Sequence, residues 1–463
     1  QGLIVQLGQS PFLKIISGDQ IAQTLRLMEK PRDTRLIHDV AREICQRVNA
    51  TVTVEGSIAT LGNQYVLGLN AVNCSTGETF VQEQVTADGK QKVLSALGDA
   101  ASRLRSKLGE SRRSLERYDV PLAQGTTSSL EALQAFSRGD QAFFRMDFVS
   151  AASFLERAVS LDANFAQAHS LLGVVKGGGG LGSENLKKSY DLRDRVNEAE
   201  RFVILKNYHI YVTGNLDTAL KTGQQFIQFY PQNPLAVSNM PVNYMFLGQF
   251  ERALTAAVES NRLEPTASGY QVLSNLYLYL NRLDEARATI QQARAQKMDA
   301  PMFGYRLWLI ADFQNDKSGM AENETAARQY LGPFSMEILE AAHKGRVSRL
   351  RDFVKRRVAL LTQSNRIGGA AQVKADAARF EALIGNSNAA KTAAMEASKM
   401  STSSYVQGNA ALALGLAGDT AGALKLVTDL NQSFPERTTV RFCYSPSTRA
   451  ALALYQRKPQ EAI

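Results

Sequence analysis

The chain has 463 residues, of which 44% are hydrophobic and 21% are charged. These fractions are close to the average of folded soluble proteins, so they exclude a disordered, collagen-like or membrane-dominated chain. At roughly 150 residues per domain, the length corresponds to about three domain equivalents. The 53 Lys and Arg exceed the 44 Asp and Glu by nine, which permits an anionic partner without requiring one.

The three cysteines, Cys45, Cys74 and Cys443, are odd in number and far apart. We therefore expect no disulfide framework, and no CxxC pair is present for a zinc or redox site. Cys45 and Cys74 are expected to be small buried hydrophobic residues. The longest apolar run lies around residues 410–417 and is far shorter than the ~18 residues that span a bilayer, so no transmembrane segment is expected.

Both ends of the sequence indicate a piece of a longer polypeptide. Gln1 is followed at once by a short amphipathic stretch from Leu3 to Leu7, without the basic region that opens a signal peptide. The last two residues, Ala462 and Ile463, fall inside an unfinished repeat. We therefore expect further chain on both sides.

Residues 1–109 are predicted to form a small α/β domain. Ser17 to Gln20 form a capping box that opens a helix, and Gly109 is a suitable left-handed end for the last helix of the domain. Runs rich in β-branched residues, separated by turn residues, predict an antiparallel meander. The predicted strands are residues 51–54, 65–72 and 79–86, and residues 12–16, if they form a short strand, would add a fourth. The predicted helices after the first stretch cover residues 17–27, 37–48 and 93–108.

Residues 110–127 lose this periodicity and contain Pro121 and Gly125 after a basic run, so they are predicted to be a linker or hinge. From residue 128 to the end almost every segment is predicted to be helical. The fold therefore changes across this segment.

Glycine, alanine and proline recur in residues 128–463 at offsets of 34 residues, which is the period of the tetratricopeptide repeat. A small residue where two helices cross lets their backbones approach, and a proline after the second helix ends it. The coincident pairs are Gly139 and Gly173, Gly214 and Gly248, Ala219 and Ala253, and Pro231 and Pro265.

One position in the second helix of each repeat can be followed along the chain. Its steps are uneven between Met320 and Ala390, so the copies there are degenerate, and we count nine to ten repeats with the last incomplete. Lys176 to Ser183 interrupt the second repeat, and a long helix through Asp191 to Arg195 is expected after them. The followed residues are Ala151, Ala219, Ala253, Ala286, Met320, Leu350, Ala390, Ala423 and Ala462.

Residues 128–463 resemble tetratricopeptide-repeat proteins. The copy that carries the resemblance has Tyr244, Leu247 and Gly248, Ala253 and Pro265 where the family has its tyrosine, its turn glycine, its small second-helix residue and its terminal proline. The resemblance implies a right-handed α-solenoid whose concave face, lined mainly by first helices, binds peptides or partner helices.

Residues 1–109 look like a TolB amino-terminal-type domain, on Ser10 to Leu13, Val54 to Ser57, and Gln64 with Tyr65. That domain would normally open with a strand, so the chain is expected to be truncated at its start. The tandem order, with Ser128 to Leu133 opening the array, resembles the carboxy-terminal half of bacterial membrane-anchored serine/threonine kinases.

The kinase resemblance implies a catalytic domain and a membrane helix outside this chain, with this region as an extracytoplasmic sensor or scaffold. The chain itself has no Gly-rich loop with a following Val-Ala-Ile-Lys, no His-Arg-Asp and no Asp-Phe-Gly, so it carries no kinase active site. Related bacterial regulators join similar halves to a winged-helix domain or a nucleotide cyclase.

No residue pattern predicts a catalytic, cofactor or metal site. Lys176 precedes the glycines at 177–180, whereas a phosphate-binding loop needs its lysine after them, so an inter-helix loop is expected. Neither the histidines nor the cysteines have ligand spacing or a nucleophile context. Asp191 and Glu198 are expected on a solvated ion-pair face. The four histidines, expected to be structural or exposed, are His38, His169, His209 and His343.

The strongest surface feature is a basic cluster with a net charge of +6 between Lys344 and Arg357. A solvated helix face explains it most simply, and an anionic partner such as lipid headgroups or an acidic protein is the alternative. Trp308, at the helix-crossing position, is expected to be a packing residue. The members of the cluster are Lys344, Arg346, Arg349, Arg351, Lys355, Arg356 and Arg357, which surround Asp352.

We therefore predict a mainly α protein, a tetratricopeptide α-solenoid after a small α/β domain, with no enzymatic activity and no cofactor. The expected function is a protein- or peptide-binding scaffold or sensor of a bacterial signalling protein, with Tyr244 and Tyr277 as candidates for the groove. The alternatives are the regulatory region of a serine/threonine kinase, and anion or nucleic-acid binding through residues 344–357. The expected location is the extracytoplasmic side of the cell envelope, with the cytoplasm as the alternative, and a membrane would be reached only through an anchor outside this chain.

Overall fold

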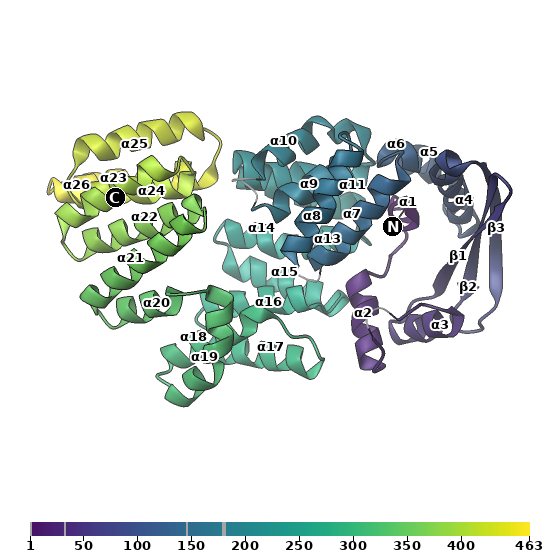
Figure 1. Cartoon of the computed structure of the whole chain (residues 1–463), viewed down its shortest axis with the longest axis horizontal. Helices are drawn as coiled ribbons and strands as arrows, with labels where there is room; N and C mark the ends of the chain where they lie inside the picture. The colour runs from purple at the N-terminus through teal and green to yellow at the C-terminus, as the bar shows by residue number, and fades with distance from the viewer. Residues whose placement is uncertain (1, 32–33, 145–146, 178–181) are drawn as a thin grey trace. The chain divides into compact units, whose positions relative to one another are not determined.

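The computed structural model describes residues 2–31, 34–144, 147–177 and 182–463, apart from the side chains of residues 19 and 301. Two compact units share the chain, Gln1–Val212 with Asp217–Asp299, and Thr213–Leu216 with Ala300–Ile463. The fold is a tetratricopeptide-like helical solenoid with a small α/β part, as predicted (Figure 1). Within the described ranges, no helix is long and apolar enough to cross a bilayer.

The α/β part of the first unit contains one antiparallel sheet in the order β1-β2-β3, which confirms the predicted meander (Figure 1). α4 packs against β2 and β3, and α3 packs against β1. The strands are β1 Val52–Leu61, β2 Gln64–Asn73 and β3 Thr79–Asp88. The helices are α1 Gly2–Gly8, α2 Gly18–Leu27, α3 His38–Arg47 and α4 Val93–Lys107.

The core of this part follows from the two-residue period of the strands. Leu69 and Ala71 of β2 pack with Ala100 and Leu104 of α4. The segment 12–16 does not form a further strand, because no ladder pairs it with the sheet. Its alternate side chains Leu13 and Ile15 nevertheless pack against the same core, which explains the strand-like pattern.

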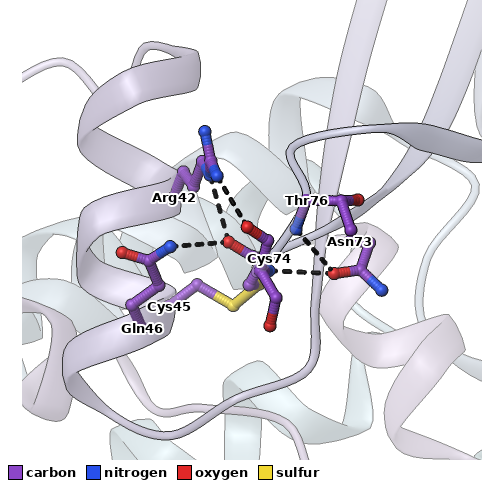
Figure 2. The surroundings of a disulfide bond; sticks show 7 residues. Arg42, Cys45, Gln46, Asn73, Cys74 and Thr76 are labelled. Carbon is purple, nitrogen blue, oxygen red and sulfur yellow. Dashed lines mark hydrogen bonds between the residues drawn. A yellow bond between two sulfur atoms is a disulfide. The ribbon is translucent and has the colours of Figure 1, made fainter.

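A disulfide joins Cys45 of α3 to Cys74 at the end of β2, so the expectation of unpaired cysteines was wrong (Figure 2). Both residues are buried, as predicted, and their Cα atoms are 6.0 Å apart. Arg42 and Gln46, also on α3, donate hydrogen bonds to the Cys74 carbonyl at 3.1 and 2.8 Å. These bonds hold the two cysteines in the same relative position as the disulfide does.

The segment expected to be a linker contains two short helices, α5 Arg112–Tyr118 and α6 Leu122–Gly125. Arg105 at the end of α4 is fully buried and forms ion pairs with Glu110 at 2.7 Å and with Asp119 at 2.8 Å. Gln6 of α1 also donates to Asp119, at 2.7 Å. The segment is therefore packed against the α/β part through a buried polar network.

Helix pairs make up the rest of the first unit. In each pair the second helix packs against the first. The first helix of the third pair continues as a π-helix, Tyr208–Thr213. The pairs are α7 Leu130–Phe144 with α8 Phe148–Leu161, α9 Ala166–Val175 with α10 Ser183–Asp191, α11 Glu198–Asn207 with α12 Leu216–Phe229, α13 Pro234–Ser238 and α14 Met240–Phe246 with α15 Phe250–Leu263, and α16 Ala267–Tyr279 with α17 Leu283–Ala295.

The second unit continues the same pairing, with small buried residues, mostly alanine, between its last helices. A π-helix, Val440–Tyr444, precedes its last α-helix. The helices are α18 Pro301–Phe313 with α19 Lys317–Leu331, α20 Ser335–His343 with α21 Val347–Gln363, α22 Ile367–Leu383 with α23 Ser387–Met400, α24 Ser404–Leu416 with α25 Thr420–Ser433, and α26 Ser445–Tyr455.

The residues that recur with the 34-residue period have the packing roles expected of them. Gly248 has φ +71° at the turn between α14 and α15, and Pro265 follows the end of α15. Trp308 is 3% exposed and packs against Ala327 and Met336, which confirms it as a packing residue. Among the second-helix residues followed along the chain, Met320 and Ala462 are only half-buried, and Ala462 lies outside any α-helix. The others have at most 5% exposure: Ala151, Ala219, Ala253, Ala286, Leu350, Ala390 and Ala423.

The glycines at helix crossings allow the close approach that the period predicts. A Cβ atom added to Gly139 of α7 would lie 2.7 Å from Cγ of Leu155 on α8, and Leu155 is fully buried. Gly139→Ala should therefore lower the free energy of unfolding by about 1 to 3 kcal/mol, as overpacking does. Urea denaturation measures the change. Gly368→Ala on α22, where an added Cβ meets nothing within 4 Å, should not lower the free energy of unfolding. Equal losses of stability in the two variants would contradict the role of Gly139 at the helix crossing.

Candidate protein-binding groove

The basic cluster lies at the end of α20 and along α21, and much of its charge is used within the protein. Arg351 forms a bidentate pair with Glu381, at 2.6 and 2.7 Å. Lys344 pairs with Glu340, Arg356 pairs with Asp352, and Arg357 donates to the Pro333 carbonyl. In the described part of the chain, no salt bridge reaches the three exposed cations Arg346, Arg349 and Lys355.

One face of α21 borders an apolar groove with a cavity volume of about 520 Å³. α21 and α23 are second helices of successive pairs, and α22 is the first helix between them in sequence. Six of the eight apolar side chains that line the groove are half-buried and Ala359 is exposed, whereas Leu350 is buried, so most of the apolar lining is not completely covered by the chain itself. The apolar lining consists of Leu350, Val354, Val358 and Ala359 of α21, Ala377 and Phe380 of α22, and Ala389 and Ala393 of α23.

Charged side chains border this apolar lining. The Arg351–Glu381 pair and the Lys374–Glu396 pair are neutral overall, whereas Lys355 is a cation with no ion pair among the described residues. Hydrogen bonding from Arg351 holds the pKa of the Glu381 carboxyl below its ordinary value, so this pair stays ionised at neutral pH. The groove is therefore apolar inside, with an excess positive charge at its border.

This arrangement suits non-covalent binding of a side chain or a helix. Apolar pockets with a few charged groups at the rim are typical of peptide-binding sites, because burial supplies affinity and the rim charges select the partner. Among the described residues, no group of three His, Cys, Asp or Glu side chains could hold a metal ion. The groove itself contains no histidine, cysteine or serine that could act as a nucleophile.

The two predicted groove tyrosines lie elsewhere, in the first unit. Arg252 lies over the ring of Tyr244 at 4.5 Å, and Arg282 lies over the ring of Tyr277 at 4.9 Å. Each arginine belongs to the start of the second helix of the same pair, so each tyrosine contacts its own helix turn. Whether either also contacts a ligand stays a prediction.

The other residues singled out in the sequence are dispersed. His38 pairs with Glu55 at 2.7 Å, His343 pairs with Asp312 at 2.9 Å, and His169 bonds Asn185 at 3.0 Å. Cys443 is exposed and unpaired. Within the expected glycine loop, residues 178–181 lie outside the described residues. The expected long helix is wrong, because α10 ends at Asp191 and a 3-10 turn, Arg193–Arg195, follows.

No protein-family model matches the chain. Similar solved structures include PilW, a widely conserved type IV pilus biogenesis factor (16% identity, 43% of this chain and 94% of that chain, TM-score 0.32). The APC/C hetero-tetramer Cut9–Hcn1 is also similar (16% identity, 76% of this chain and 62% of that chain, TM-score 0.38). So is a tetratricopeptide repeat protein from Parabacteroides merdae (13% identity, 71% of this chain and 100% of that chain, TM-score 0.29). These sequence identities and TM-scores are too low for any surface of those proteins to be transferred to this chain.

Sequence reasoning found the charged side of the groove and missed its apolar floor. Arg351 and Lys355 belong to the predicted basic cluster, whereas Ala377, Phe380 and Ala393 gave no signal. A half-buried alanine in a groove has the same helical spacing as a buried alanine in the core, so periodicity does not separate the two.

Proposed function

We propose that this chain is a protein-binding scaffold without catalytic activity, and that the groove on α21, α22 and α23 is one of its binding sites. The observation that carries this proposal is the set of half-buried apolar side chains in one cavity of about 520 Å³. Helical arrays of this kind bind partners through extended surfaces, since each pair of helices adds a further strip of surface. The proposed site lies largely on second helices, in addition to the concave face expected from the repeat resemblance.

The proposed partner is an amphipathic helix with acidic residues beside its apolar face. Apolar residues at helical spacing would cover Val354, Val358 and Phe380, as in other helix-in-groove complexes. Lys355, Arg346 and Arg349 lack ion pairs among the described residues and are exposed, so acidic residues would be attracted to this helix. Nucleic acid is not proposed, because most cations of the cluster are engaged within the protein.

A photo-crosslinking amino acid at position 358 tests the groove in a native bacterial extract, with position 395 on the exposed side of α23 as the matched control. An adduct specific to position 358 identifies a candidate partner, whose affinity is then measured with purified proteins. Val354→Glu places a carboxylate in the apolar groove and should weaken binding by about tenfold or more, whereas Met395→Glu should not. Equal affinities for these two variants would contradict the proposal.

We further propose that the chain works in an oxidising compartment, on the extracytoplasmic side of a bacterial envelope. The buried Cys45–Cys74 disulfide supports this, since such bonds persist outside the reducing cytoplasm. The tandem order of the two parts resembles the outer half of membrane-anchored serine/threonine kinases, so the scaffold would pass a binding signal to a catalytic domain elsewhere. Thiol labelling under denaturing conditions, after acid trapping of the native protein, tests the location: reactive Cys45 and Cys74 would place the chain in a reducing compartment.

A further inference from the structure

A second cavity, in the first unit, is lined by three arginines and has a volume of about 360 Å³. Arg117 and Tyr118 come from α5, Arg193 comes from the 3-10 turn after α10, and Arg201 comes from α11. The cavity therefore lies where the segment that joins the α/β part to the helix pairs meets the second and third pairs. Its remaining lining residues are Val120, Asp194, Val196 and Glu198.

Two of the three guanidinium groups, those of Arg117 and Arg193, stack on aromatic rings, and Arg193 and Arg201 are only loosely paired with a carboxylate. Arg193 lies 4.1 Å from the centre of the Tyr190 ring and donates to the Tyr190 carbonyl at 2.8 Å. Arg117 lies over the rings of Tyr118 and Phe229, and no described carboxylate forms an ion pair with it. Asp194 approaches Arg193 and Arg201 only to 3.9 and 3.7 Å, distances too long for direct hydrogen bonds.

The charge balance of the cavity favours an anion. Three arginines face two carboxylates, and Glu198 already accepts a hydrogen bond from Tyr230 at 3.2 Å. α11 also begins at the cavity, and its N-terminal end adds partial positive charge. Three guanidiniums offer more donors than one carboxylate can use, whereas a phosphate monoester presents three oxygens and two negative charges.

We propose that this cavity binds a small phosphate monoester. The phosphate would contact Arg117, Arg193 and Arg201, and the organic part would lie against Val120, Val196 and Tyr118. The cavity has room for on the order of ten water molecules, more than a phosphate group alone would occupy. A ligand here would contact both the joining segment and the helix pairs, which provides a small-molecule input independent of the proposed groove.

Isothermal titration calorimetry of the full chain at constant ionic strength tests the site, with phenyl phosphate and inorganic phosphate as probes. We expect phenyl phosphate to bind and inorganic phosphate to bind more weakly, because it lacks the apolar part. Arg201→Gln should weaken phenyl phosphate binding by about tenfold or more, since charge-assisted hydrogen bonds are lost. Arg201 is exposed, so this substitution should leave the thermal midpoint unchanged.

Arg195→Gln is the matched control. Arg195 is an exposed arginine of the 3-10 turn that also contains Arg193, and it does not line the cavity. This variant should bind phenyl phosphate as the unmodified chain does. The proposal is overturned if millimolar phenyl phosphate does not bind, or if Arg201→Gln and Arg195→Gln bind it equally well. Tighter binding of inorganic phosphate than of phenyl phosphate would also overturn it, because the apolar wall would then have no role.

Discussion

Replacing Arg105 by methionine is expected to destabilise the first unit by about 3 to 5 kcal/mol, the range found when one partner of a buried ion pair is removed. The Arg105 side chain is 0% exposed and the Glu110 side chain 3% exposed. Methionine would leave Glu110 buried without the two charged hydrogen bonds from Arg105, at 2.8 and 2.7 Å. It would also remove the hydrogen bond from Arg105 to Asp119, at 2.8 Å. Urea denaturation followed by circular dichroism measures the loss.

The same network predicts a dependence on pH. Burial favours the neutral form of Glu110, but hydrogen bonds from Arg105, Ser114 and Ser10 outweigh it and hold its pKa below the ordinary 4.5. Because the pKa is lower in the folded chain, this stabilisation is complete above pH 4.5 and is lost as the pH falls below it. Arg105→Met should therefore lose less stability than the unmodified chain as the pH falls below 4.5.

Arg112→Met is the control, because Arg112 is exposed and, among the described residues, forms its ion pair with Glu116 one turn away. This substitution removes the same charge and should give no measurable change in stability. If both variants unfold at the same urea concentration, the Arg105 network does not hold the joining segment in place.

Loss of the disulfide is the second large effect. Cys45 and Cys74 are separated by 29 residues, and closing a loop of this length stabilises a protein by roughly 3 to 4 kcal/mol, mainly through the unfolded state. The double variant Cys45→Ala, Cys74→Ala should therefore unfold at a lower temperature than the oxidised chain. Calorimetry of both proteins, with and without a reducing agent, measures the difference.

The reducing agent supplies the internal check on this prediction. It should lower the unfolding temperature of the unmodified chain and leave the double variant unchanged. Cys443→Ser removes the exposed free cysteine and should respond to the reducing agent as the unmodified chain does. A double variant as stable as the oxidised chain would show that the hydrogen bonds of Arg42 and Gln46 suffice to hold α3 against β2.

Local pattern predicted most of the fold. Ser17 does cap the start of α2, although the Gln20 side-chain oxygen accepts no hydrogen bond from the described residues. The three strands of the meander were predicted, and the 34-residue glycines lie at helix crossings or turns. The disulfide was missed because cysteine number and spacing describe the chain and not its geometry. Cys45 and Cys74 meet only because α3 packs beside the sheet, which is a tertiary contact.

The candidate sites were predicted only where charge marks them. The basic cluster is visible in sequence, but its pairing with Glu381 depends on how α21 and α22 pack. Ala375 is fully buried and Ala377 lines the groove, although they are two residues apart in one helix. The arginine cavity was missed because the chain leaves the helix after Asp191, which brings Arg193 rather than Arg195 to the cavity.

Hydrogen–deuterium exchange of the full chain, with and without the partner identified by crosslinking, tests the scaffold proposal most directly. Binding in the groove should slow amide exchange in α21, α22 and α23, because a docked helix covers their exposed faces and suppresses local opening. Val354→Glu should abolish this protection, and Met395→Glu should retain it. Protection confined to other helices, with α21 to α23 exchanging as in the free chain, would contradict the account.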